Sequence, residues 1–344
     1  MVPPGIRDVA ARAEVSVGTV SNVLNRPTKV SPAATERVLA AIEELGFVRN
    51  DAARQLRAGH SSAIGLIVLD ARNPFFTDVA RGAEDQASVS GFSVLMGNTD
   101  DNPDREAGYL DLFEQQRVAG VLISPIGDVT ARLQRLRDRG IAAVLVDRSG
   151  DATTFSSVSV DDVAGGRLAV DHLIDSGRRR IAFVGGPFAI RQVDERYSGA
   201  EQSVAGHPDT TLETVRLSGL TVLEGRRAGA QILARPAADR PDAIFAANDL
   251  IAMGLLQAFM MAGATGISSA TGISVPDDIA IIGYDDIDFA SAAVVPLSSI
   301  RQPSSTIGQT AVTILLEEAD DADLPHRQVV FQPELVVRQS TRSE

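Results

Sequence analysis

The sequence has no cysteine and no tryptophan, and aromatic residues make up only 4% of its 344 positions. The absence of cysteine excludes disulfide bonds, thiolate metal sites and cysteine nucleophiles. No stretch approaches the roughly 18 consecutive apolar residues that a membrane-spanning helix needs. The N-terminal segment MVPPGIRDVA also lacks the apolar run of a signal peptide. We therefore expect a cytoplasmic protein with no membrane partner.

Motifs for catalysis are also missing. The sequence contains no HExxH, no GxSxG and no phosphate-binding GxxxxGK[ST] motif. The histidines are scattered along the chain, as is typical of surface or core positions: His60, His172, His207 and His326. We expect neither an enzyme nor a bound metal ion or cofactor.

The charge is unevenly distributed along the chain. The whole sequence has a net charge of -13 and an isoelectric point near 4.8, which by itself argues against nucleic-acid binding. Residues 1–60, however, hold eight basic and six acidic side chains and so carry +2, which leaves -15 for the rest. A small basic end on a large acidic body is typical of a DNA-binding domain joined to a separate regulatory domain.

Two short segments near the N-terminus have the apolar spacing of helices. The first set is Ile6, Val9, Ala10 and Ala13, and the second is Val20, Val23 and Leu24. Between them, Ser16 is placed to cap the second helix with its hydroxyl group. On spacing alone, plain core packing of two short helices is the commoner explanation. The alternative is a helix-turn-helix, whose second helix enters the DNA major groove.

The segment from Asp8 to Asn25, DVAARAEVSVGTVSNVLN, resembles the LacI family of bacterial transcription regulators along its whole length. The resemblance implies a homodimer that binds pseudo-palindromic operator DNA, so that the protein is associated with the nucleoid. We expect Val17, Gly18 and Asn22 to read the bases, with Asn22 preferring adenine. Glu14 stands in the turn where the family usually has glycine, and a left-handed backbone there would cost about 1 kcal/mol.

Ser31 and Pro32 predict the start of a third helix with a buried stripe at Val38, Leu39, Ile42 and Leu45, and Gly46 predicts its end. This helix would close a DNA-binding domain over residues 1–47. In the family, the next segment, here 48–61, is a hinge that becomes helical on DNA and inserts a leucine into the minor groove; by resemblance this is Leu56, although it could instead anchor a linker. The residues predicted to contact DNA are Ser16, Val17, Gly18, Thr19, Ser21, Asn22, Asn25, Lys29, Ala53, Arg54, Leu56 and Arg57.

From residue 63 onward, short apolar runs alternate with amphipathic stretches, which predicts an α/β fold with buried parallel strands. The expected strands are AIGLIVLD, FSVLM, AGVLIS and IAAVLVD, then IAFVG, a weaker strand near 213–217, DAIFAAN and IAIIGYDD. They resemble the two doubly wound lobes of the type I periplasmic-binding-protein fold that LacI regulators carry. We expect residues 62–158 and 300–328 in the first lobe, and 159–299 and 329–344 in the second. Residues 200–214 are unusually polar, and 264–274 look like an inserted surface loop.

Ligands of such sheets bind beyond the carboxyl ends of the strands, so the residues that follow each apolar run are candidates for the site. Two aromatic rings could hold the faces of a sugar, while the polar side chains could bond adjacent hydroxyl groups. The set resembles that of ribose-binding proteins, except that Leu220 stands where an aromatic residue is expected. Each residue also has a structural explanation, such as core packing for the two phenylalanines. The predicted effector-binding residues are Asn73, Phe75, Phe76, Asp147, Arg148, Arg196, Leu220, Asn248, Asp285 and Gln302.

Three functions remain open at this stage. The first is a dimeric DNA-binding regulator, most simply a repressor, controlled by a small sugar such as a pentose. The second is a sugar-binding component of a transport system, which the missing signal peptide and the basic N-terminal end disfavour. The third is an enzyme, which no sequence motif supports.

Overall fold

The computed structural model describes residues 4–47, 61–150, 153–264 and 273–342. The chain forms two compact units, residues 1–61 and residues 62–344. We call them the headpiece and the effector domain. None of the described helices is long and apolar enough to cross a membrane.

The headpiece is a three-helix unit, α1 (Ile6–Arg12), α2 (Val17–Asn25) and α3 (Pro32–Leu45), with a short 3-10 turn at Pro27–Lys29. As predicted, Ser16 caps α2, because its Oγ accepts a hydrogen bond of 3.0 Å from the amide of Thr19. Val9, Val20 and Val38 are fully buried and join the three helices in one core. The headpiece therefore contains the two short helices that the apolar spacing predicted, in the helix-turn-helix arrangement that the resemblance to the LacI family implied.

Details of the headpiece differ from the expectation. Gly46 ends α3, as predicted, and its backbone is left-handed; Glu14 also has a left-handed backbone, with φ of 52°. Ser31 stands at the N-cap of α3, but its side chain makes no capping bond. Leu39 is 53% exposed, and Ala41 is buried in its place, because positions 38, 41, 42 and 45 share one helical face and position 39 does not.

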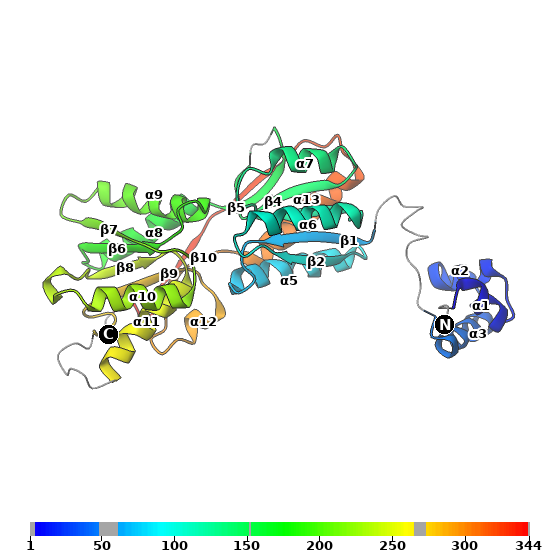
Figure 1. Ribbon diagram of the computed structural model, residues 1–344, viewed down its shortest axis with the longest axis horizontal. Coiled ribbons are helices and arrows are strands. Elements are labelled where there is room, and N and C mark those ends of the chain that lie inside the picture. Colours follow the sequence, from blue (N-terminus) through cyan, green and yellow to red (C-terminus); the bar gives the residue numbers. More distant parts are fainter. Residues whose placement is uncertain (1–3, 48–60, 151–152, 265–272, 343–344) are drawn as a thin grey trace. The chain divides into compact units, whose positions relative to one another are not determined.

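The effector domain has two lobes, each built on a six-stranded sheet (Figure 1). The first sheet is entirely parallel. Helices α5 (Pro74–Val89) and α13 (Ser304–Asp320) cover one face, and α6 (Pro103–Gln115) and α7 (Thr130–Arg137) cover the other. In spatial order its strands are β11 (Gln328–Phe331), β5 (Ser156–Val160), β4 (Ala142–Val146), β3 (Gly120–Ile123), β1 (Ala63–Val68) and β2 (Ser93–Asn98).

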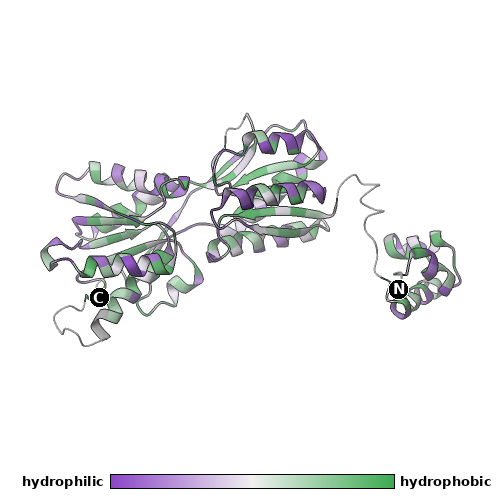
Figure 2. Ribbon diagram, in the orientation of Figure 1, coloured by the Kyte–Doolittle hydropathy of each residue, from purple (hydrophilic) through white to green (hydrophobic). Residues whose placement is uncertain are grey.

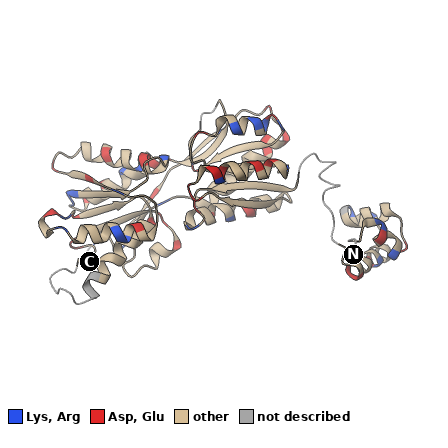
Figure 3. Ribbon diagram, viewed as in Figure 1, with Lys and Arg blue, Asp and Glu red and all other residues tan. Residues whose placement is uncertain are grey.

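The second sheet repeats this order, except that its edge strand β12 is antiparallel to β10. Helices α8 (Asp162–Asp175) and α9 (Arg191–Ala205) cover one face, α10 (Val222–Leu233) and α11 (Asp249–Ala264) cover the other, and α12 (Asp288–Ser291) follows β9. In spatial order the strands are β12 (Glu334–Val336), β10 (Ser298–Arg301), β9 (Ala280–Asp285), β8 (Ala243–Ala246), β6 (Arg180–Gly185) and β7 (Thr211–Arg216). The strands are the most apolar part of both lobes, whereas charged residues lie mostly on helices and loops (Figures 2 and 3).

The crossings between lobes correct the expected boundaries. The sequence places residues 329–331 in the second lobe, but β11 pairs with β5 in the first. Ser159 and Val160 likewise belong to β5 of the first lobe, and Ile300 and Arg301 belong to β10 of the second. The chain therefore crosses after β5, after β10 and after β11. A four-residue strand such as β11 carries no local signal for which sheet it joins, because its partner is remote in sequence.

Two segments expected to be unusual have simple structures. Residues 200–214 hold the end of α9 and the start of β7, an edge strand whose exposed side chains explain the polar composition. The run SVLM of the expected strand lies in β2, which starts at Ser93, but Leu95 and Met96 are 43% and 46% exposed, because β2 is an edge strand and not a buried one. Residues 265–272 of the expected surface loop lie outside the described part of the chain.

Candidate functional site

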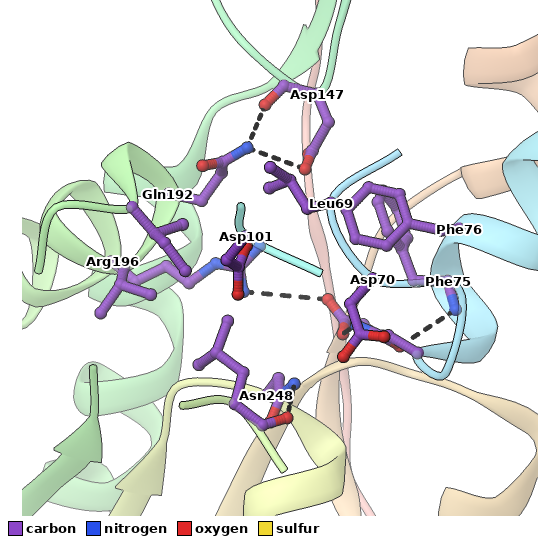
Figure 4. Close-up of a pocket in the computed structure, with 14 residues that line it drawn as sticks. Leu69, Asp70, Phe75, Phe76, Asp101, Asp147, Gln192, Arg196 and Asn248 are labelled. Carbon is purple, nitrogen blue, oxygen red and sulfur yellow. Dashed lines mark hydrogen bonds and ion pairs between the residues drawn. The ribbon is translucent and has the colours of Figure 1, made fainter. Parts of the chain in front are cut away.

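A cavity lies between the two lobes, at the carboxyl ends of their strands (Figure 4). The free volume between its walls is about 40 Å³, well below the roughly 300–1,000 Å³ of small-molecule sites, so a ligand enters only when lining side chains or the lobes move. Its lining combines apolar and hydrogen-bonding side chains: Leu69, Asp70, Asn73, Phe75, Phe76, Asp101, Asp147, Ile190, Gln192, Val193, Arg196, Leu220, Asn248 and Asp285.

Each lobe contributes one buried carboxylate from the end of an equivalent strand. Asp147 directly follows β4 and Asp285 is the last residue of β9, and the two strands hold the same place in their sheets. Both residues have positive φ, 56° for Asp147 and 102° for Asp285. Such backbone conformations carry strain for a residue with a side chain and are found at binding sites more often than elsewhere. Here they turn the chain sharply at the wall of the cavity.

Each of these carboxylates accepts a hydrogen bond from an amide of the opposite lobe. The Nδ2 of Asn73, at the N-cap of α5, donates to Asp285 Oδ2 at 2.9 Å. The Nε2 of Gln192, in the first turn of α9, donates to Asp147 Oδ2 at 2.9 Å and also to the Asp147 carbonyl oxygen. From the crossover after β10, Gln302 Nε2 donates to Asp285 Oδ1 at 2.7 Å. The protein's own side chains therefore bridge the lobes across the cavity.

Arg196 on α9 is the cation of the site. Its Nε donates to Asp162 Oδ1 at 2.7 Å, and its guanidinium lies 3.7 Å from the centre of the Tyr284 ring. The same group is 3.8 Å from Asp285 Oδ1, so it interacts with two carboxylates. Burial disfavours its charge, but these neighbours outweigh burial and raise the pKa of Arg196. The guanidinium is therefore permanently charged and fixed in position.

The buried carboxylates outnumber this cation. Burial raises the pKa of Asp147 well above its ordinary value, and the nearby charges of Asp162 and Asp285 raise it further. Burial also raises the pKa of Asp285, while Arg196 acts in the opposite direction. The site thus favours partners that donate hydrogen bonds to carboxylate oxygens.

Two aromatic rings form part of the apolar wall. Phe75 and Phe76 lie on the first turn of α5, with ring centres 5.0 Å apart and planes at 70°. Both are largely buried, so they belong to the core of the first lobe as well as to the cavity. On the opposite side, Asn248 Nδ2 donates to the Leu220 carbonyl oxygen at 3.2 Å, which ties two wall segments together.

Eight of the residues predicted from sequence line this cavity, and two do not. Gln302 lies behind the wall and supports Asp285. Arg148 points elsewhere, because its guanidinium donates to the Gly127 carbonyl oxygen at 2.7 Å and lines a separate hollow beside α7. Sequence reasoning missed Gln192, although its place in the first turn after β6 matches that of the phenylalanines after β1. It also missed the wall residues Leu69, Asp70, Asp101, Ile190 and Val193.

The predicted DNA-contacting residues of the headpiece lie on or beside α2. Val17 is 43% exposed, and Gly18, Asn22 and Lys29 are also exposed. The Thr19 hydroxyl lies 2.9 Å from Ser16 Oγ and so takes part in the helix cap. Ser21 is partly exposed on the same helix. The remaining predicted residues lie outside what the structure describes: the side chain of Asn25, and Ala53, Arg54, Leu56 and Arg57.

No group of side chains among the described residues could hold a metal ion.

Residues 5–50 match the family model for bacterial regulatory proteins of the lacI family, and residues 170–341 match the model for a periplasmic binding protein-like domain. The chain is 33% identical to the HTH-type transcriptional repressor PurR of Photobacterium profundum over 340 residues, which is 98% of each protein.

Solved structures agree with these matches. The lac repressor dimer bound to operator and the anti-inducer ONPF has a TM-score of 0.81 and 26% identity, over 99% of this chain and 100% of that one. A LacI family regulator from Enterococcus faecium with bound ribose has a TM-score of 0.71 and 26% identity, over 81% of this chain and 98% of that one.

Proposed function

The chain belongs to the LacI family of bacterial regulatory proteins, and on this basis we propose that a small sugar, a pentose such as ribose, sets its affinity for operator DNA. The protein is a DNA-binding transcriptional repressor regulated by a small-molecule effector. We place its action in the cytoplasm at the nucleoid, where operator DNA is found.

The composition of the cavity wall is the main support for a sugar as the effector. The edge-to-face pair Phe75 and Phe76 stands beside the buried groups Asp147, Arg196 and Asp285 in one cavity. An aromatic ring contacts the C–H face of a sugar, and carboxylate and guanidinium groups pair with adjacent hydroxyls. A purely apolar ligand could not replace the hydrogen bonds that these buried groups make with the protein, so displacing those bonds would cost free energy. The ribose bound to the Enterococcus faecium relative supports a pentose.

The proposed mechanism links the cavity to DNA through the position of the lobes. A ligand that bonds both lobes favours the lobe arrangement that fits it, and the first lobe, which starts with β1 at Ala63, directly follows the proposed hinge segment in the chain. The ligand can change DNA affinity only by its preference between two arrangements, typically about 1–3 kcal/mol. Because the relation is reciprocal, operator DNA must change sugar affinity by the same factor.

We also propose that the regulator acts as a homodimer on a pseudo-palindromic operator, since one helix-turn-helix alone binds DNA weakly. Apolar side chains exposed on α5 and β2, namely Val89, Leu95 and Met96, offer a surface on the first lobe that a second copy could cover. Sedimentation of the full chain should give a dimer. A monomer at concentrations that saturate operator would contradict this part of the proposal.

Thermal unfolding against a panel of pentoses, hexoses, phosphorylated sugars and purine bases tests the effector class. Any ligand that binds only the folded protein raises the midpoint by mass action. We expect a rise with D-ribose or a close relative, lost in Phe75→Leu, which keeps an apolar core residue but removes the ring. Arg148→Gln, outside the cavity, is the control that keeps the response. A rise with a purine or a phosphorylated sugar, and none with any free sugar, would contradict the pentose.

The runner-up is a sugar-binding transport component without DNA activity. The two lobes alone would allow it, but such a component has no use for the helix-turn-helix headpiece. Selection of binding sites from random DNA separates the two functions, since a transport component would enrich no sequence.

A further inference from the structure

The two cross-lobe hydrogen bonds in the cavity are related by the repeat of the fold. In one, Asn73 of the first lobe donates to Asp285 of the second; in the other, Gln192 of the second lobe donates to Asp147 of the first. The amides stand at the starts of α5 and α9, which follow the equivalent strands β1 and β6. The carboxylates stand at the ends of the equivalent strands β4 and β9. Each lobe therefore gives one amide and receives one.

All four side chains are buried. Their exposed fractions are 8% for Asn73, 7% for Gln192, 4% for Asp147 and 6% for Asp285. Hydrogen bonds to charged groups that are shielded from water are stronger than those at the surface. A third contact near the cavity, from Arg191 to the Ser149 carbonyl oxygen at 3.2 Å, also joins the lobes. These hydrogen bonds join the two lobes directly.

Buried acceptor atoms without a partner in the described part of the chain lie in the wall of the cavity and directly behind it. Asp147 Oδ1 and Gln302 Oε1 are buried and have no hydrogen-bond partner among the described residues. The amide nitrogens of Asn73, Gln192 and Gln302, in contrast, each already donate at least one hydrogen bond to a carboxylate or carbonyl oxygen. A hydroxyl-rich ligand must therefore share or take over the same carboxylates.

We propose that Asn73 and Gln192 form a two-point latch that holds the lobes together before the effector binds, and that the effector's hydroxyl groups replace these amides on Asp147 and Asp285. The ligand then takes over bonds that already span the cavity. It must present hydroxyl groups to both carboxylates at once, which makes Asp147 and Asp285 determinants of effector specificity, in competition with the two amides. This second part rests on the proposed function, whereas the latch itself does not.

The latch is tested by the distance between the lobes in the protein without sugar. Because the chain has no cysteine, Ala131→Cys on α7 and Glu201→Cys on α9 introduce the only two thiols, both at exposed positions, for spin labels. Diluting the labelled full-length chain with excess unlabelled chain restricts electron double resonance to distances within one chain. The latch is removed by combining Asn73→Ser and Gln192→Met. Serine keeps an oxygen that can cap α5, where Asn73 Oδ1 accepts from the Phe75 amide, and methionine keeps the size of glutamine.

We expect the double variant without sugar to shift to longer distances by more than the width of the original distribution, and each single variant to shift less. The control Gln231→Met, on an exposed site of α10, should leave the distribution unchanged. Equal distributions for the double variant and the original protein would overturn the latch and leave the proposed function untouched. If one single variant fails to fold, the other still tests its own contact.

Replacement of the amides is tested by nitrogen-edited NMR of the side-chain NH2 groups, assigned from the two single variants. Saturation with D-ribose should move both pairs of signals in the original protein. If these signals do not move although ribose raises the unfolding midpoint, the effector does not replace the amides. Ribose would still be a ligand of the protein. If ribose does not change the unfolding midpoint, the proposed pentose effector is wrong. The distance measurement without sugar would still test the latch.

Discussion

Gly166 of α8 is in direct backbone contact with Arg196 of α9: a Cβ atom on Gly166 would lie 2.1 Å from the Arg196 carbonyl oxygen. The contact is reciprocal, since a Cβ on Gly199 of α9 would lie 2.1 Å from the Val163 carbonyl oxygen. The two helices can approach this closely only because neither position has a side chain. Since α9 also carries Gln192, this contact sets the position of one wall of the cavity.

Gly166→Ala should therefore disturb both stability and effector binding. Overpacking typically costs about 1–3 kcal/mol of unfolding free energy, and the displaced α9 should weaken sugar binding as well. Gly108→Ala is the matched control, because it lies in α6 with no atom within 4 Å of the added Cβ and should stabilise by about 0.5–1 kcal/mol. Denaturant unfolding and sugar titration of both variants check this. Equal behaviour of the two alanines would contradict the close contact.

Asp147→Asn should stabilise the effector domain at neutral and alkaline pH. Burial raises the pKa of Asp147 in the folded protein above its unfolded value. The folded state therefore holds this proton more tightly, and its contribution to stability is present at acid pH and is lost as pH rises through the raised pKa. Asparagine has no such loss, so the gain in unfolding midpoint over the original protein should grow as pH rises from the unfolded pKa of about 3.9 toward the raised pKa of Asp147. Asp320→Asn, at an exposed site, should show no such growth.

Glu14→Gly should stabilise the headpiece by up to about 1 kcal/mol, because glutamate at φ of 52° carries left-handed strain that glycine does not. Glu14→Ala keeps a Cβ atom and should give no gain. Hydrogen exchange of the helix amides in residues 5–46 of the full chain measures the change. Equal protection in the glycine and alanine variants would argue against strain at this turn.

Asn22→Arg should change the preferred operator at one symmetric base pair, from adenine toward guanine, because the exposed side chain lies on α2 and arginine pairs with guanine edges. Lys29→Gln should instead weaken binding to all sequences and lower the salt dependence, as expected for a phosphate contact. Selection from random DNA with each variant distinguishes the two. An unchanged site for Asn22→Arg would remove Asn22 from base reading.

The sequence predicts those helices and strands that are determined by residues close together in the chain. The run AIGLIV of β1 is apolar enough to indicate a buried strand, and Ser16 with the apolar spacing around it indicates the turn between α1 and α2. Edge strands are harder, since β2 and β7 have mixed exposure and β11 has only four residues. Their partners depend on contacts remote in sequence, which explains the errors at the lobe boundaries.

The candidate site was predictable where residues follow a strand directly. Asp147 and Asp285 were found in this way, but the sequence could not say where their neighbours point. Arg148 is adjacent to Asp147, yet it turns to the Gly127 carbonyl oxygen, because consecutive side chains leave such a turn in different directions. Gln192 was missed because its partner Asp147 is 45 positions earlier, and only the repeat of the two lobes relates it to the start of α5.

The most direct test of the account is the affinity of the full-length protein for its selected operator, measured by fluorescence anisotropy at fixed salt with and without saturating D-ribose. The account predicts a change of about 5- to 150-fold in the dissociation constant, the range given by a coupling of about 1–3 kcal/mol. The same change should vanish in Phe75→Leu. Sugar that raises the unfolding midpoint but leaves the operator affinity unchanged would contradict control of DNA binding through this cavity.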